Sequence, residues 1–134
     1  MKDAAELCRG LLRKAESDRM AMEASLSAQA LDAACFHAQQ MTEKCLKAFL
    51  AHHSVAFPYT HNLTKLIELS AEIDATFRSL LPAVAPLTPY AVELRYDDSF
   101  WPNKQVAEEA RSSALAVLRF VLDCLPADTR TNAE

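Results

Sequence analysis

The sequence contains a single glycine, Gly10, among its 134 residues. A phosphate-binding loop needs several glycines at fixed spacing, so this chemistry is excluded, and sheets built on glycine turns are disfavoured. Hydrophobic residues make up 51% of the chain, a balance that suits packed helices. At this length one domain can bury a core of its own without disulfides or metal. We therefore expect an all-α protein.

Excess positive charge is also lacking, because 14 Lys and Arg residues stand against 18 Asp and Glu residues and the formal net charge is −4. The basic residues are scattered, which excludes the electrostatic footprint of a protein that binds long DNA through its backbone. A local basic patch at Lys44 and Lys47 remains open and would suit a phosphate or a short RNA. The alternative is that both lysines are solvated on an exposed face.

The sequence also lacks paired cysteines and long apolar runs. Cys8, Cys35, Cys45 and Cys124 form no Cys-x-x-Cys pair and occupy apolar helix positions, which predicts buried thiols in a reducing compartment. No stretch approaches the roughly 18 apolar residues that cross a bilayer. The charged N-terminal residues are followed by no long apolar run. We expect a soluble, cytoplasmic protein without membrane contact.

Metal and cofactor motifs are missing as well. The histidines His52 and His53 are adjacent, so on a helix they point about 100° apart and cannot easily share an ion. His61 and Cys45 lie near them in the sequence but complete no ligand pair at i and i+4. No Ser-His-Asp order or paired-carboxylate pattern stands out. We expect no metal and no cofactor.

Helical spacing of apolar residues runs through most of the chain and is interrupted by caps and prolines. The expected main helices begin after Asp3, at about 28, after Thr60 or Asn62, and after Asn103; a short helix covers 90–95, and 74–81 forms a further turn or helix. The expected fold is an antiparallel up-and-down helical bundle of four main helices plus one short helix. The first two and the last main helices pack as neighbours. Residues 1–126 form one domain and 127–134 a mobile C-terminal tail.

The helix expected over about 28–53 has a well-defined polar half. Its polar residues are His37, Gln39, Gln40, Glu43, Lys44 and Lys47, and its apolar residues are Leu31, Ala34, Cys35, Ala38, Met41, Cys45 and Phe49. The polar half is the first place to search for a ligand site.

Three segments together carry a family resemblance: the helix over 34–50, then 57–63 (Phe-Pro-Tyr-Thr-His-Asn-Leu), then 87–96 (Leu-Thr-Pro-Tyr-Ala-Val-Glu-Leu-Arg-Tyr). In this order and spacing they resemble the HEPN domain, the higher-eukaryote and prokaryote nucleotide-binding family, over roughly Leu11 to Leu125. The resemblance implies a HEPN-like helical domain and a homodimer. It also implies pairing with a minimal nucleotidyltransferase, in arrangements similar to toxin–antitoxin modules.

Ribonucleases of this family share an arginine followed, after four to six residues, by a histidine. No arginine of this chain has a histidine at that distance; after Arg95 the required positions hold Phe100, Trp101 and Pro102. Attack by a 2′-hydroxyl needs a group that exchanges protons near neutral pH, which histidine supplies. The chain therefore resembles a non-ribonuclease branch, and we do not expect RNA cleavage by the usual means. An atypical site that brings His37 or His61 near Arg95 remains the alternative.

A second dense polar cluster follows the proline-rich segment and contains Tyr90, Glu93, Arg95, Tyr96 and Asp98. In the structural interpretation, a buried Arg95 or Glu93 ties this segment to the helix over 28–53, through Gln40 or Lys44. In the functional interpretation, Arg95 joins Lys44 and His37 around an anion, and Tyr90 or Tyr96 offers a stacking face. Phe100 and Trp101 are expected to cover the core, or else to form a partner surface.

The resulting prediction is a non-catalytic protein that binds a nucleotide or small anionic ligand, pairs with a minimal nucleotidyltransferase, or does both. The alternatives are an RNA-cleaving toxin with an atypical active site and a purely structural dimerisation module. The expected ligand-binding residues are His37, Gln40, Lys44, Lys47, Tyr90, Arg95 and Tyr96.

Overall fold

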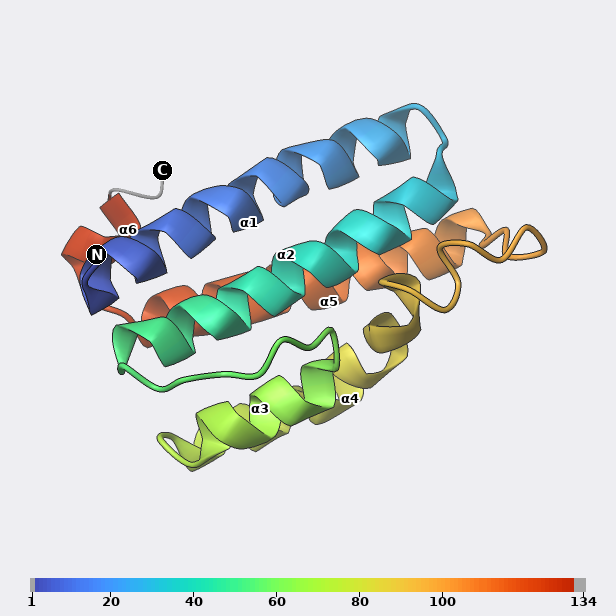
Figure 1. The fold of residues 1–134 in the computed structure, drawn as a ribbon. Helices are drawn as coiled ribbons and strands as arrows, with labels where there is room; N and C mark the ends of the chain where they lie inside the picture. The colour runs from blue at the N-terminus through green and yellow to red at the C-terminus, as the bar shows by residue number, and fades with distance from the viewer. Residues whose placement is uncertain (1, 132–134) are drawn as a thin grey trace.

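The computed structural model describes residues 2–131, and within this range every regular element is helical. The elements are α1 (Ala4–Ser27), α2 (Leu31–His52), α3 (Leu63–Ala71), the 3₁₀ helix η1 (Ala75–Leu80), α4 (Leu81–Val84), the 3₁₀ helix η2 (Ala85–Tyr90), α5 (Lys104–Asp123) and α6 (Ala127–Thr131). The predicted all-α bundle is confirmed. Helix α2 lies at its centre, antiparallel to α1 and flanked by α5 and α3 (Figure 1).

Side-chain caps explain where three of these helices begin. Asp3, Asn62 and Asn103 each accept a hydrogen bond from the backbone N–H three residues later, before α1, α3 and α5 respectively. An acceptor at this position satisfies one of the unpaired N–H groups of the first turn. Helix α1 ends before Gln29, whose φ is 60°, and this left-handed residue turns the chain back into α2.

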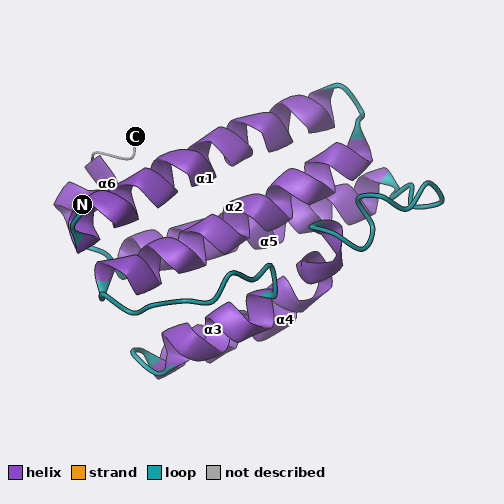
Figure 2. Cartoon of the chain, in the orientation of Figure 1, coloured by secondary structure: helices purple, strands orange, loops and turns teal. Residues whose placement is uncertain are grey.

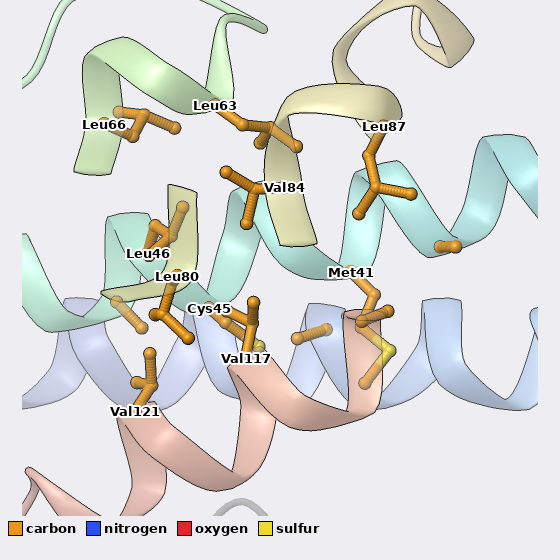
Figure 3. Packing of buried hydrophobic residues seen from close by; sticks show 14 of the residues in the cluster. Met41, Cys45, Leu46, Leu63, Leu66, Leu80, Val84, Leu87, Val117 and Val121 are labelled. Carbon is orange, nitrogen blue, oxygen red and sulfur yellow. The ribbon is translucent and has the colours of Figure 1, made fainter. Parts of the chain in front are cut away.

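The core lies between α2, α5 and the short elements around α3. Met41, Cys45 and Leu46 of α2 meet Val117 and Val121 of α5 there (Figure 3). Leucines of α3 and the segment 80–87 close the cluster from the other side. The apolar stripe of α5, which includes Ala110, Ala114, Val117 and Val121, is thus buried inside the chain.

The segment after α3 departs from the expected short helix. Residues 85–90 form η2, and residues 91–96 are turns rather than the predicted helix over 90–95. Pro86 and Pro89 supply no N–H donor, so the chain is held in 3₁₀ geometry and does not propagate an α-helix. The loop that follows projects past the end of the bundle where α2 begins (Figure 2).

Residues 127–131 form helix α6, which packs near α1, whereas the sequence suggested that a mobile tail begins at 127. Thr129 is buried, so this part of the segment adds to the bundle. Residues 132–134 of the expected tail lie outside the described residues. Among the residues described, no helix is long and apolar enough to span a bilayer.

Candidate functional site

A hollow of about 380 Å³ lies between the first turns of α2 and the segment that follows η2. Its polar and aromatic lining is Asp32, Phe36 and His37 of α2 with Tyr90, Arg95, Tyr96 and Phe100 of the opposite segment. Four of the seven residues predicted to bind a ligand, namely His37, Tyr90, Arg95 and Tyr96, therefore lie in one place. The side chains come from positions more than 50 residues apart in the sequence, and the bundle brings them together.

Arg95 is the cationic group of the hollow. Its guanidinium carbon lies 3.7 Å from the centroid of the Phe36 ring and 5.9 Å from that of Tyr96. A guanidinium stacked on a ring keeps its N–H donors in plane and free to bind a planar or tetrahedral anion. Within the described residues Arg95 forms no ion pair with a carboxylate. Both Arg95 and Glu93 are exposed, so the predicted buried tie to α2 through Gln40 or Lys44 is wrong, and Arg95 contacts α2 at the Phe36 ring instead.

His37 is oriented by a buried acid on the neighbouring helix. Its Nδ1 lies 2.9 Å from Asp18 Oδ1, and Asp18 is 8% exposed. An acceptor on Nδ1 fixes the imidazole so that Nε2 is the nitrogen left for a ligand. Lys44 Nζ lies 2.5 Å from the other oxygen of Asp18, so this lysine neutralises Asp18 and does not line the hollow.

Gln40 and Lys47 also lie outside the hollow, further along α2. Gln40 donates to the side-chain oxygen of Gln39 at 2.7 Å. Lys47 Nζ donates to Glu43 at 3.0 Å and lies 5.6 Å from the centroid of the Phe57 ring. Because His37, Gln40, Lys44 and Lys47 are spaced by three or four residues, they still share one side of the helix.

Glu43 is the second buried acid of α2, at 5% exposed. Its Oε1 accepts from His61 Nδ1 at 2.7 Å and from Gln39 at 3.1 Å. The bond to His61, with the one that the Gln39 side chain donates to the His61 carbonyl oxygen at 3.2 Å, fastens the loop between α2 and α3 to the side of α2. Gln39 and Glu43 belong to the predicted polar half of α2, yet both are buried, because the loop packs against them.

The aromatic wall of the hollow is formed by Tyr90 and Phe100, whose stacked rings have centroids 5.5 Å apart. Burial, and secondarily the neighbouring Cys35, raises the pKa of Tyr90, so its hydroxyl stays protonated. Burial likewise raises the pKa of the Cys35 thiol to about 11. The wall is therefore uncharged near neutral pH, and Tyr96, 81% exposed, stands at its rim.

The rim is stabilised by short-range hydrogen bonds in the loop. Asp97 accepts from the backbone N–H and the hydroxyl of Ser99, and these bonds lower the pKa of Asp97. Trp101 Nε1 donates to the Asp98 carbonyl at 2.9 Å. Trp101 is nevertheless 72% exposed, so the prediction that it covers the core is wrong, since the loop projects beyond the bundle.

A second, larger hollow of about 760 Å³ lies between α5 and the segment 82–90. Its charged lining is Glu108, Glu109 and Lys104, and Lys104 lies within 3.8 Å of Glu108. Two carboxylates and one paired lysine repel an anion, so this hollow does not suit a phosphate. Across the described residues no cluster of three His, Cys, Asp or Glu side chains is arranged to hold a metal ion.

Asp18 positions His37 at the hollow and Glu43 fastens the loop between α2 and α3, and the sequence pattern alone assigned neither acid this role. A signal for Asp18 was present, because it continues the buried spacing Cys8, Leu12, Ala15 and Met22 of α1. An acid at such a position predicts a partner on the facing helix. For Glu43 the signal was its spacing of four from both Gln39 and Lys47, but the contact with His61 depends on the path of a loop.

The bundle is an all-helical domain in which an arginine and an acid-held histidine line a hollow at one end of the central helix. The HEPN domain family model matches residues 8–124, and the chain belongs to this family. Its structure is similar to the crystal structure of an archaeal HEPN homologue, with a TM-score of 0.69 and 22% sequence identity. That match covers 92% of this chain and 98% of the homologue. Among curated proteins no match is found.

Proposed function

We infer that this chain is a non-catalytic HEPN protein that binds a nucleotide or small anionic ligand in the hollow between α2 and the segment 90–100. The observation that carries the proposal is Arg95, an arginine that lines the hollow, is stacked on Phe36 and has no carboxylate partner among the residues that the structure describes. His37 adds a second donor or acceptor held by Asp18. Tyr90 and Phe100 provide a neutral face against which a base can stack.

The remaining predicted residues flank this hollow. Gln40, Lys44 and Lys47 continue the same side of α2, where a short RNA longer than one nucleotide would pass. Both lysines are engaged by buried acids, so their contribution to the affinity for an anion is smaller than that of Arg95. We place the main ligand contact at Arg95.

The test is isothermal titration of the protein with ATP, GTP and a short oligonucleotide. The wild type is expected to release heat with at least one of these ligands, and Arg95→Ala to weaken that binding by tenfold or more. Arg78→Ala is the matched control, because Arg78 is exposed on η1, outside the hollow. Absence of heat with every ligand would favour a purely structural dimerisation module. An equal loss of affinity in Arg95→Ala and Arg78→Ala would mean that the ligand binds outside this hollow.

A second candidate function, RNA cleavage at an atypical site, is favoured by the contact of His37 with Asp18. This pair leaves Nε2 as the ring nitrogen without a bond to Asp18, and His37 lines the same hollow as Arg95, an arrangement suited to proton transfer beside a phosphate. Incubation with structured RNA separates the two functions. Cleavage by the wild type that is lost in both His37→Ala and Arg95→Ala would support the enzyme; intact RNA supports the binding protein.

We also propose that the protein forms a homodimer and pairs with a minimal nucleotidyltransferase. Membership of the family supports both, and exposed Trp101 offers an aromatic anchor. Sedimentation equilibrium is expected to give twice the chain mass, with a weaker association in Trp101→Ala. A monomer at all concentrations would contradict the dimer. Co-purification with a nucleotidyltransferase encoded beside this chain tests the second partner.

A further inference from the structure

The hollow carries two opposite charges that do not pair with each other. Arg95 and Asp32 both line it, yet no ion pair joins them, and the Asp32 carboxylate forms no hydrogen bond or ion pair with any described residue. Asp32 is exposed on the first turn of α2. Because Asp32 and Phe36 are four residues apart, they share a face of the helix. The ring of Phe36, on which Arg95 stacks, therefore lies on the same side as the acid.

A ligand that satisfies both groups needs an anionic end for Arg95 and a donor edge for Asp32. A carboxylate accepts two parallel hydrogen bonds from neighbouring N–H groups. Among the common bases, the Watson–Crick edge of guanine offers such a pair at N1–H and the 2-amino group. On the corresponding edge of adenine, the acceptor N1 lies beside a single amino group. A carboxylate repels this acceptor and can accept only the one hydrogen bond from the amino group.

The size and charge of the hollow limit the rest of the ligand. A volume of about 380 Å³ is near the lower end of the range for small-molecule sites, about 300–1,000 Å³, and holds one nucleotide unit. The negative charge of Asp32 disfavours additional phosphates close to it. The ligand therefore carries a single phosphate, which lies at the side of the hollow lined by Arg95 and His37. The base then stacks on Tyr90 and Phe100.

We propose that the hollow is selective for a guanosine monophosphate unit, with Asp32 reading the base and Arg95 binding the phosphate. This inference rests on the proposed function and names its ligand class. Free guanosine monophosphate (GMP) and a guanosine within a short RNA share this chemistry. The two sources are distinguished by titrating the nucleotide by itself and the trinucleotide AGA against AAA.

The experiment compares GMP with AMP by isothermal titration, and AGA with AAA by fluorescence anisotropy. The wild type is expected to prefer the guanine ligand by about tenfold or more in at least one pair. Asp32→Asn should reduce the ratio of the guanine to the adenine affinity to near one. The amide N–H of the asparagine then faces an N–H donor of guanine. Asp98→Asn is the matched control, an exposed acid on the loop that does not line the hollow, and should keep the preference.

The outcomes separate this inference from the proposed function. Equal affinity for guanine and adenine ligands, both lost in Arg95→Ala, would overturn guanine selection and leave the nucleotide site in place. A guanine preference that survives in Asp32→Asn would also overturn the role of Asp32. No binding of any of these ligands would overturn both proposals. A preference lost in Asp32→Asn and kept in Asp98→Asn supports the assignment.

Discussion

Asp18 illustrates how one buried acid sets the chemistry of two side chains on another helix. Its two oxygens bind His37 and Lys44 at 2.9 and 2.5 Å, so the histidine is oriented while the charge of the lysine is compensated. A buried carboxylate without such partners would be costly. Asp18 is thus at once a structural link between α1 and α2 and the group that positions His37 at the hollow.

Replacement of Asp18 by Asn is expected to lower the free energy of unfolding by about 1–3 kcal/mol, because Lys44 loses a charged acceptor in a partly buried place. Urea denaturation measures the change. Asp98→Asn, which alters an exposed acid, should stay within about 0.5 kcal/mol of the wild type. If the two variants lost the same stability, Asp18 would not be the link described.

Phe77 is the corresponding apolar example. It is fully buried, with its ring centroid 4.3 Å from that of Phe49 and 4.9 Å from that of Phe120. Phe77→Ala should cost about 3–5 kcal/mol in urea denaturation, since a large cavity remains between α2 and α5. Met20→Ala, at a position 63% exposed, is the control and should change stability little. A small loss in Phe77→Ala would mean that the core closes around the cavity.

At the scale of elements, helix starts were accessible from the sequence and loop paths were not. Asp3 and Asn103 could be predicted as caps because the capping bond is local, within three residues. The turns over 91–96 and the loop over Glu43 depend on contacts with distant parts of the chain. His37 and Arg95 could be suggested as neighbours because an anion needs such donors, whereas the places of Asp32 and Phe36 beside Arg95 depend on how the segment 90–100 packs against α2.

Helices α1 and α5 are joined by a two-point ion pair, in which Arg111 donates to both oxygens of Glu23 at 2.6 and 2.8 Å. These hydrogen bonds lower the pKa of Glu23 from its ordinary value of 4.5. A carboxyl whose pKa is depressed on folding stabilises the protein above its unfolded-state pKa, and the contribution is lost as pH falls through the folded-state value.

The expected result is that Glu23→Gln lowers the melting temperature at pH 7 but has little effect near pH 3. Both side chains are about a third exposed, so solvent screening limits the loss at pH 7 to about 1 kcal/mol. Thermal melts of wild type and variant across pH 3–7 measure it. If the difference in melting temperature between wild type and variant stayed constant down to pH 3, the effect would come from packing and not from charge.

At the scale of the whole molecule, all four cysteines are free and three of them are buried. Burial raises the pKa of Cys8 to about 11 and that of Cys45 to about 12. Native protein at pH 8 should therefore react slowly with a thiol reagent such as Ellman's reagent, because the thiolate is the attacking form. In denaturant all four should react quickly. Rapid reaction of the buried thiols in native protein would indicate a loosely packed bundle.

The packing of the whole bundle also explains why the hollow in which we propose a ligand lies at one end of α2. The loop fastened to Glu43 runs along the side of α2 (Figure 1), and the hollow lies at the first turns of this helix, beside the segment that follows η2. A single sequence indicates that α2 is amphipathic, and only the packing shows which part of its polar side is accessible.

The central claim is that a nucleotide binds between α2 and the segment 90–100, and amide chemical shifts in a ¹⁵N-labelled sample test it most directly. Titration with GMP is expected to move the signals of 32–37 and 90–100 together, with little change at α3 or α6, and Arg95→Ala should suppress these shifts. Shifts confined to the hollow beside α5, or unchanged spectra at saturating nucleotide, would contradict the account.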